Sequence, residues 1–432
     1  SKLKLIQGNL LIDGKSTNPI EKGAVLIKNN TILEIGSPEI ITPSDKNSFE
    51  IFDFSDKTIL PGLVDCHVHL NGFGDGRTGD DLALLPDEIL TLQSAKNARE
   101  SLLSGVTTAR DCGAKNLTTF MLRKAINQGI TIGPRLILSG RAIAIIGGHL
   151  SYFGEEVTGN DECRAAVRQL IKEGSDFIKI TATGGSTATS YPWRPSFTTE
   201  EIRTICEEAH KFGKLVSAHC VSSEGISNSL DGGVDQIIHC LFREPDGSPK
   251  YRPDLTQKII DKNIFVNATI HQGLESLNNL ILYQNNTKEE KNAIKKLQEE
   301  HSVRLEHCLR MKDAGVKFVC GSDASWQQYK LGQFYKEIVA HTTIGLSPIE
   351  SIISATLDSA IACGVDDQVG SIEKGKKADL IIVNGNPLNN IENIKDVDTV
   401  FGTPIAPMSS YSYENNQENA PDVGNGKKSL FL

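Results

Sequence analysis

The sequence has no apolar run near the ~18–20 residues that a membrane-spanning helix requires. It also has no long block of like charge, and 54 acidic against 45 basic residues give a formal net charge of −9. A mildly acidic surface of mixed charge gives no support for a nucleic-acid partner. The chain opens with a strand-like segment, SKLKLIQG, so we expect neither a signal peptide nor a membrane partner.

Cysteine pairs with metal-ligand or redox spacing are missing as well. The nine cysteines are an odd number, and no two of them form a CxxC motif. Several lie in apolar, strand-like segments, where a free cysteine behaves as a small hydrophobic residue. This pattern argues against a disulfide framework and for a reducing compartment, so we expect a cytoplasmic protein.

The central part of the chain, residues 57–365, repeats a strand–loop–helix unit. Eight strands are predicted there, which is typical of an α/β protein with a (β/α)8 TIM barrel. The predicted helices include a long polar one over Lys288–Ala314, and Pro348–Cys363 is predicted as a single added helix.

The two ends of the chain have a different pattern. Residues 1–56 contain short predicted strands, two of them at Leu3–Ile6 and Asn9–Ile12, and strands return at Gly370–Val383 and Val397–Phe401. We expect residues 1–56 and 366–405 to form one small β-sandwich domain. The tail over 406–432 is rich in Ser, Asn and Gly, and we expect it to be flexible or loosely docked.

A histidine pair stands at the end of the first predicted barrel strand, in the segment LPGLVDCHVHL (Leu60 to Leu70). Side chains of a strand alternate between faces, so His67 and His69 point the same way. Two imidazoles on one face can bind one metal ion. Taken alone, the pair is also compatible with two surface histidines near a turn.

Other chemically active side chains fall at later strand ends, where barrel enzymes carry their active sites. His219 and His239 each end an apolar strand, and Asp323 follows another one. The alternatives are histidines satisfied in the core or in loops, and an aspartate that caps a helix before Trp326. Asp111 completes the set at the end of the second strand.

Lys179 is the least ordinary member, because it lies within the strand-like segment Asp176–Thr181. An ammonium ion in a packed strand layer would be desolvated at a large free-energy penalty. The lysine could instead extend to solvent from the strand end. Carbamylation by carbon dioxide would remove the charge and supply a carboxylate able to bridge two metal ions, and burial favours that reaction by lowering the amine pKa.

Six segments in fixed order resemble the metal-dependent amidohydrolase superfamily, in its prolidase-, carboxypeptidase- and imidazolonepropionase-like branch. The resemblance covers about residues 1–405 and rests on PGLVDCHVHL, FIKI, SAHC, QIIHC, GSDASW and KKADLIIVNGNPL. It implies that His67 and His69 bind the more buried metal ion with Asp323. It also implies that His219 and His239 bind a second ion, with carbamylated Lys179 as the bridge. Imidazolonepropionase-like members use one metal ion and lack this lysine.

Substrate-binding candidates lie on the loops that should reach the same mouth. Gly147-Gly148-His149 resembles a motif of this branch whose histidine helps to hold the substrate, although Leu150-Ser151 replaces the usual glycine-aspartate. We therefore expect His149 to serve in binding and catalysis. The glycines of Thr183–Thr187 lack the following residues of a P-loop and are expected to permit a tight loop. The other pocket candidates are Tyr191, Trp193, Arg194 and Trp326.

These observations predict a hydrolase with two divalent metal ions, zinc being the expected metal. A metal-bridging hydroxide would attack a C–N amide-type bond of a small-molecule amide or peptide: a dipeptide, an N-acyl amino acid, or an aryl amide, carbamate or urea. Asp323 would carry the proton to the leaving nitrogen. The alternatives are a mononuclear cyclic amide hydrolase or deaminase, and an inactive scaffold, which would be expected to have lost ligands. We also expect a homo-oligomer.

Overall fold

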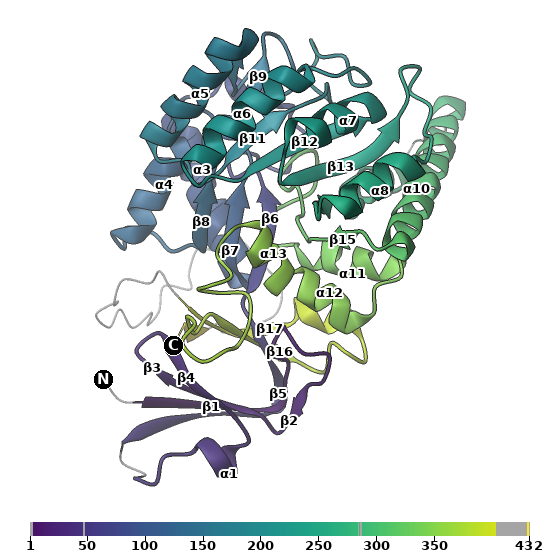
Figure 1. The fold of residues 1–432 in the computed structure, drawn as a ribbon. Coiled ribbons are helices and arrows are strands. Elements are labelled where there is room, and N and C mark those ends of the chain that lie inside the picture. The colour runs from purple at the N-terminus through teal and green to yellow at the C-terminus, as the bar shows by residue number, and fades with distance from the viewer. Residues whose placement is uncertain (1–2, 46–47, 284, 286, 403–429, 432) are drawn as a thin grey trace.

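The computed structural model describes residues 3–45, 48–283, 285, 287–402 and 430–431, which form a mixed α/β fold with parallel sheets (Figure 1). A sheet built from both chain ends lies at one end of the molecule, and the alternating strands and helices make up the rest. Apart from Leu430 and Phe431, the predicted tail lies outside the described residues.

The sheet of the chain ends is mixed and has β5 near its centre. β5 pairs in parallel with β1 on one side and antiparallel with β16 on the other, so the N-terminal and C-terminal segments share one sheet. Its buried side chains include Ile6, Ile59 and Ile382. The strand order is β18 (Leu430–Phe431), β17 (Val397–Phe401), β16 (Leu380–Asn384), β5 (Phe49–Pro61), β1 (Leu3–Leu11), β3 (Ala24–Lys28) and β4 (Thr31–Gly36), and β2 (Ile20–Glu21) pairs with β1.

Three predicted strand boundaries in this sheet differ from the structure. Leu3–Ile6 and Asn9–Ile12 merge into the single strand β1, whose pairing with β5 shifts register between Gly8 and Leu10. β5 continues through the apolar residues that we assigned to the first barrel strand and ends at Pro61. The strand predicted at Gly370–Val383 begins only at Leu380, because the preceding residues form turns.

The remaining strands form two parallel sheets. The smaller one has the order β6 (Leu63–Val68), β7 (Val106–Asp111) and β8 (Arg135–Leu138). The larger one has the order β10 (Glu155–Val157), β9 (Ile143–Ile145), β11 (Ile178–Thr181), β12 (Val216–Ser222), β13 (Gln236–Arg243), β14 (Phe265–Asn267) and β15 (Lys317–Phe318). β6, β7, β11 and β12 are buried along their whole length, as expected for parallel strands covered on both faces.

Backbone hydrogen bonds connect both edges of the smaller sheet with the larger one. The Cys66 amide of β6 donates to the Cys320 carbonyl just after β15 (3.1 Å). On the other side, the Asp176 amide before β11 donates to the Leu138 carbonyl of β8 (2.8 Å). The carboxyl ends of the parallel strands are thereby held around a common region.

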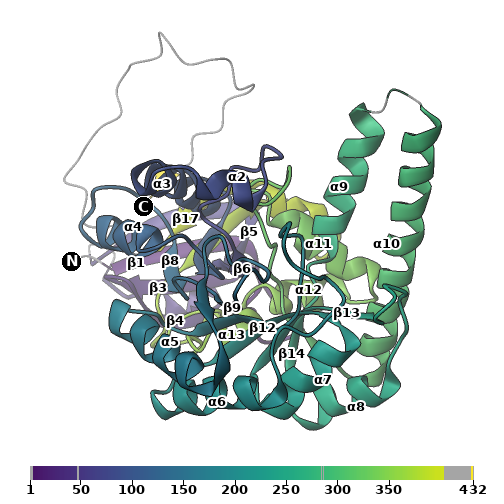
Figure 2. The same cartoon turned by 90° about the horizontal axis from the view of Figure 1, so that it is seen from above.

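Most helices agree with the sequence-based prediction, and in Figure 2 helices α4 to α8 lie outside the parallel strands. The helix α10 covers the predicted range, because Thr287 and Glu290 form a capping box at its start and Gly315 ends it with φ 107°. Helices predicted near residues 86–104, 117–128, 161–173, 199–212, 223–230 and 254–261 are confirmed as well. Together with α10 (Lys288–Ala314), they are α3 (Asp87–Leu103), α4 (Thr118–Asn127), α5 (Gly159–Glu173), α6 (Thr199–Lys211), α7 (Ser223–Gly232) and α8 (Pro253–Asp261).

Other helices were missed or misjudged. The single helix predicted at Pro348–Cys363 is two helices, since Thr356 leaves the helical region with φ −130° and ψ −93°. The helix α9 packs beside α10, and the pair projects from the rest of the molecule (Figure 2). The helices concerned are α1 (Pro38–Ile41), α2 (Gly79–Ala83), α9 (Ile270–Tyr283), α11 (Tyr335–Thr343), α12 (Pro348–Ser354) and α13 (Leu357–Ala362).

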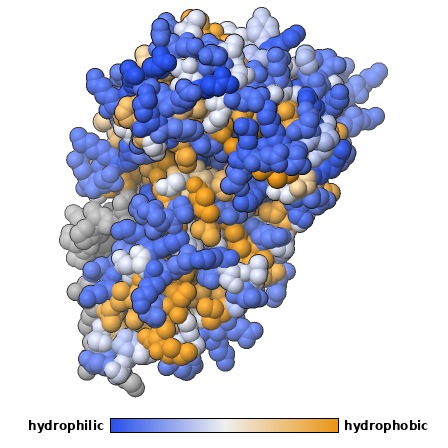
Figure 3. All heavy atoms as spheres, in the orientation of Figure 1, coloured by the Kyte–Doolittle hydropathy of each residue, from blue (hydrophilic) through white to orange (hydrophobic). Residues whose placement is uncertain are grey.

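The surface is hydrophilic over much of the helical part, and hydrophobic side chains gather between that part and the sheet of the chain ends (Figure 3). A search of the described helices finds none with the length and apolar character needed to cross a bilayer. All nine cysteines are free and buried, which confirms their prediction as small hydrophobic residues.

A fully buried arginine on β7 joins three elements below the strand ends. The Arg110 side chain donates through Nε to the Cys66 carbonyl (2.7 Å) and through Nη1 to the Ala362 carbonyl (3.0 Å). Its Nη2 donates to the Gln236 side chain, and the guanidinium lies over the Phe177 ring at 4.9 Å. No acidic partner is present among the described residues, so hydrogen bonds and the aromatic ring stabilise this cation.

We expect Arg110→Met to destabilise the protein by about 3 kcal/mol or more, because it removes the guanidinium hydrogen bonds to two buried carbonyls and to Gln236. Calorimetry should show a clearly lower midpoint of thermal unfolding than for the wild type. The exposed Arg203 of α6 provides a matched control, and Arg203→Met should leave the midpoint nearly unchanged. Equal midpoints for both variants would contradict a supporting role for Arg110.

Candidate active site

A cavity of about 440 Å³ lies at the carboxyl ends of the parallel strands. His67 comes from β6, Lys179 from β11, His219 from β12 and His239 from β13, whereas His69 and Asp323 follow the ends of β6 and β15. The structure therefore brings together all six residues predicted as metal ligands. The predicted residues that line the cavity are His67, His69, His149, Lys179, Trp193, His219, His239, Asp323 and Trp326.

Three buried side chains form the tightest cluster of this cavity. The Oδ1 atom of Asp323 lies 3.2 Å from His67 Nε2 and 3.3 Å from His69 Nε2. One potential ligand atom from each residue lies within 4.8 Å of the other two. Two imidazoles and a carboxylate at this spacing suit a divalent metal ion such as zinc.

The two imidazoles of the cluster are oriented by groups behind them. His69 Nδ1 lies 3.0 Å from the Gly113 carbonyl, which can only accept, so Nδ1 carries the proton. His67 Nδ1 lies 2.9 Å from Asn267 Oδ1, and the Asn267 amide nitrogen donates to the Gly321 carbonyl (3.0 Å). In both rings the lone pair of Nε2 therefore faces Asp323, as a metal ligand requires.

The second histidine pair has its own partners. His219 Nε2 donates to the Gly184 carbonyl (2.9 Å), which leaves its Nδ1 as the free ligand atom. His239 Nδ1 bonds Thr269 Oγ1 (2.7 Å), and its Nε2 is 4.0 Å from Asp323 Oδ2. The centroids of the two imidazole rings are 4.7 Å apart.

Burial keeps His67, His219 and His239 in the neutral form that binds metal. It lowers the pKa of His219 to about 3, with a further contribution from Lys179. The pKa values of His67 and His239 are also well below the usual range, first because of burial and then because of nearby positive charge. Backbone strain gathers here too, since His239 and Asp323 have φ values of 69° and 56°.

Lys179 lines the same cavity as the two groups of ligands. Its side chain is only 1% exposed, so the alternative of a lysine that extends to solvent is wrong. Within the described part of the chain it has neither a hydrogen bond nor an ion pair. A buried ammonium ion without a counter-charge is unfavourable, whereas a carbamate between two metal ions would be neutralised by them. The donor set around Lys179 thus fits two divalent ions better than it fits a free amine.

Asp323 and Asp111 take different positions. No described helix begins directly after Asp323, so its alternative role as a helix cap is wrong. Asp111 does not line the cavity. It accepts hydrogen bonds from the Leu70 amide (2.7 Å) and the Gly113 amide (3.2 Å), and burial raises its pKa. Asp111 therefore holds the backbone that follows β6 and β7.

The predicted substrate residues separate into two groups. His149 lies against His219, with ring centroids 4.3 Å apart, and its Nδ1 bonds Thr187 Oγ1 (3.1 Å). Trp326 stands 5.0 Å from the His69 ring. Tyr191 and Arg194 do not line the cavity, which corrects our expectation for both. They flank a turn in which the Arg194 amide donates to the Tyr191 carbonyl (3.1 Å), and both side chains are exposed while Trp193 faces inward.

Sequence reasoning missed several residues of the site. Asn267 ends β14, so the rule that strand ends carry the site could have found it. Arg304 lies in the polar helix α10, where an arginine is usually a solvated surface residue, and no signal in the sequence sets it apart. The missed residues that line the cavity include Arg77, Tyr152, Thr187, Gln272 and Arg304.

A family model described as the amidohydrolase family matches residues 58–405. The chain belongs to the amidohydrolase family. Ochratoxinase of Aspergillus niger is 27% identical over 428 residues, which cover 91% of this chain and 83% of the relative. A solved structure of a Xaa-Pro dipeptidase with bound methionine has a TM-score of 0.80 at 31% identity and covers 93% of this chain and 98% of that one. A 5-methylthioadenosine/S-adenosylhomocysteine deaminase of Carboxydothermus hydrogenoformans is 25% identical, with coverages of 92% and 90%.

These similarities confirm the predicted superfamily, including its prolidase-like branch. The protein is a hydrolase that acts on carbon–nitrogen bonds, as predicted. Members of this superfamily are typically metal-dependent, and this amidohydrolase has a possible metal site in His67, His69 and Asp323.

We expect Asn267→Ala to lower metal affinity by about 10- to 100-fold, the usual effect of losing a group that orients a metal-binding histidine. Competition with a chromophoric chelator would measure the affinity. Asn127→Ala, at the exposed end of α4, is the control and should bind metal like the wild type. Unchanged affinity in the Asn267 variant would mean that His67 does not depend on Asn267 for its orientation.

Proposed function

We propose that this amidohydrolase binds two divalent metal ions and hydrolyses the amide-type bond of a small molecule. The substrates that we favour are dipeptides, N-acyl amino acids, and aryl amides, carbamates or ureas. The observation that carries the proposal is Lys179, a buried amine that has no partner among the described residues and lines the same cavity as the His67–His69–Asp323 cluster and the His219–His239 pair. We infer that this lysine is carbamylated and that zinc is the metal.

We also propose an architecture for the site. The two parallel sheets would close into one (β/α)8 barrel, and the chain ends, 1–56 and 366–405, would form a β-sandwich domain. Support comes from the backbone hydrogen bonds at both edges of the smaller sheet, from Cys66 to Cys320 and from Asp176 to Leu138. A closed barrel places all ligand-bearing strand ends around one mouth.

The roles of the residues follow from their positions. His67, His69 and Asp323 would hold one ion, His219 and His239 the other, and carbamylated Lys179 both. When bound, the ions supply Lewis acidity, which polarises the scissile carbonyl and lowers the pKa of a water molecule. Asp323 faces the centre of the site and would take a proton from that water and deliver it to the leaving nitrogen. His149 and Trp326 would hold the substrate beside the metal centre.

A mononuclear deaminase or cyclic amide hydrolase is the second candidate. The only described group of three metal-binding side chains with mutually close ligand atoms is His67, His69 and Asp323, which could serve one ion alone. The similarity to a deaminase points in the same direction. Metal stoichiometry separates the two candidates, together with an assay of metal-replete protein on dipeptides, N-acyl amino acids, aryl amides and ureas.

Removing the Lys179 side chain should release the metal ions from the active site. We expect Lys179→Ala to lose bound metal and activity, with part of both restored by short carboxylic acids that occupy the place of the carbamate. Elemental analysis and turnover with added acetate or propionate would measure this. Lys172→Ala, an exposed lysine of α5, is the control. A high-resolution map that shows a plain amine at Lys179 with both metal ions present would refute the bridge.

A chemical role for Asp323 makes a separate prediction. Asp323→Asn should retain the fold and much of the metal, while kcat falls by at least ~100-fold, as expected when a general acid–base group is lost. Circular dichroism, metal content and steady-state kinetics would be compared with the wild type. Near-normal turnover in this variant would exclude Asp323 as the proton carrier.

A further inference from the structure

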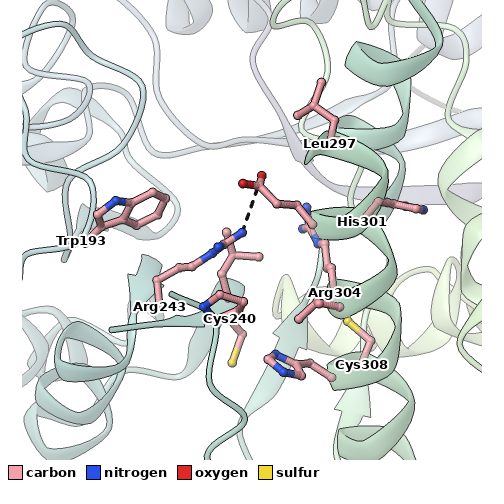
Figure 4. A pocket seen from close by; sticks show the side chains of 13 residues that line it. Trp193, Cys240, Arg243, Leu297, His301, Arg304 and Cys308 are labelled. Atoms are coloured by element: carbon pink, nitrogen blue, oxygen red, sulfur yellow. Dashed lines mark ion pairs between the residues drawn. The ribbon is translucent and has the colours of Figure 1, made fainter. Parts of the chain in front are cut away.

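A second cavity, of about 180 Å³, opens beside the candidate active site (Figure 4). It lies between the end of β13, the loop around Pro249 and the helix α10. Trp193, Leu241 and Arg304 line this side cavity and the active-site cavity alike. The two cavities therefore adjoin at these three residues.

The side cavity contains two arginines with different environments. Arg243 is ion-paired with Glu300 (3.8 Å), donates to the Gly247 carbonyl (2.9 Å) and lies 5.5 Å from the Trp193 ring centroid. Arg304 has no carboxylate partner among the residues that the structure describes. A guanidinium stays protonated at any physiological pH, so the charge of Arg304 is uncompensated at the junction of the two cavities.

Arg304 also has an N–H donor that is not used in a hydrogen bond to the described residues. Its Nη2 donates to the Ala268 carbonyl and to Thr269 Oγ1, the latter over 3.0 Å. Its Nε is buried and has no hydrogen-bond partner in the described part of the protein. A buried guanidinium donor is normally satisfied, and the planar fork of arginine matches a carboxylate. Held by α10 on one side and Thr269 on the other, the side chain is oriented before any ligand arrives.

Apart from the Arg243–Glu300 ion pair, His301 and His307, the rest of the side cavity is lined mainly by apolar and cysteine side chains. Trp193 and Leu297 lie on its sides in Figure 4, and the thiols of Cys240 and Cys308 lie deeper. An apolar pocket with one uncompensated cation suits a hydrophobic group that carries an anion. It suits a neutral aryl group less well, because a neutral group would desolvate Arg304 without pairing it.

We propose that Arg304 binds the carboxylate of the substrate and that the side cavity holds the hydrophobic side chain next to it. This inference rests on the proposed function and narrows it to amides whose amine portion is a hydrophobic amino acid, such as N-acyl amino acids and dipeptides. Arg304, rather than the predicted pocket residue Arg194, would then be the arginine that binds the substrate. His149 would act nearer the scissile bond, against His219.

A purely structural role for Arg304 is the competing explanation. Arg304 contacts Thr269, and Thr269 bonds His239, so loss of the arginine could disturb a metal-binding histidine. Such a disturbance would slow all substrates alike. An anchoring role would slow only substrates with a carboxylate.

The test compares N-benzoyl-L-phenylalanine with its neutral analogue N-benzoyl-L-phenylalaninol, in the metal-loaded wild type and in Arg304→Met. We expect kcat/KM on the acid to fall at least ~10-fold, the scale of a lost charge-assisted hydrogen bond, while kcat/KM on the alcohol changes less than ~3-fold. Arg304→Lys should retain part of the preference for the acid. Arg310→Met, on the same helix over Tyr251, is the matched control. Equal losses on both substrates would overturn the proposal.

A binding measurement tests the role of Arg304 independently of the proposed function. Calorimetry with 3-phenylpropionate and 3-phenylpropanol measures recognition without turnover. Suppose that the wild type hydrolyses neither benzoyl compound, but 3-phenylpropionate binds at least ~10-fold more weakly to Arg304→Met than to the wild type. This result would support Arg304 as the carboxylate anchor and refute the proposed substrate class. Equal affinity of wild type and variant for 3-phenylpropionate would refute the anchor, whatever the enzyme hydrolyses.

Discussion

The amine of Lys179 sets the main constraint on this structure, because it is buried in a cavity that five histidines line and no carboxylate of the described residues pairs with it. An ammonium ion in that position would repel any cation and would be poorly solvated. Each of these difficulties disappears if carbon dioxide converts the amine into a carbamate and metal ions neutralise the product. We regard the surrounding geometry as the support for that chemistry, from the lone pairs directed at Asp323 to the neutral state of His219.

Side chains and carbonyls behind the ligands are as important as the ligands themselves. Gly113 fixes His69, Asn267 fixes His67, Thr269 fixes His239 and Gly184 fixes His219. These partners come from three segments, after β7, after β11 and at the end of β14, so the ligand geometry depends on several parallel strands rather than on one loop. This explains why buried strands carry most of the proposed metal ligands, while loops carry His149 and Trp326, which we propose for substrate binding.

The sequence predicted the site best where the position of a residue on a strand decides which way its side chain points. His67, His69, Lys179, His219 and His239 were identified because strand alternation and strand ends determine which way they point. Side chains on loops could not be assigned in this way. Tyr191 and Arg194 turn outward at a tight turn, whereas the neighbouring Trp193 turns inward. Arg304 was missed because its role depends on which face of α10 meets β14, which is a tertiary contact that no local pattern encodes. The break at Thr356 likewise depends on packing.

The carbamate on Lys179 is tested most directly by ¹³C NMR of metal-loaded wild-type protein prepared in ¹³C-bicarbonate, with the metal content determined on the same sample. Two metal ions per chain and one carbamate resonance that is missing from Lys179→Ala are predicted. A sample that holds two metal ions per chain without a carbamate resonance would contradict the bridging lysine.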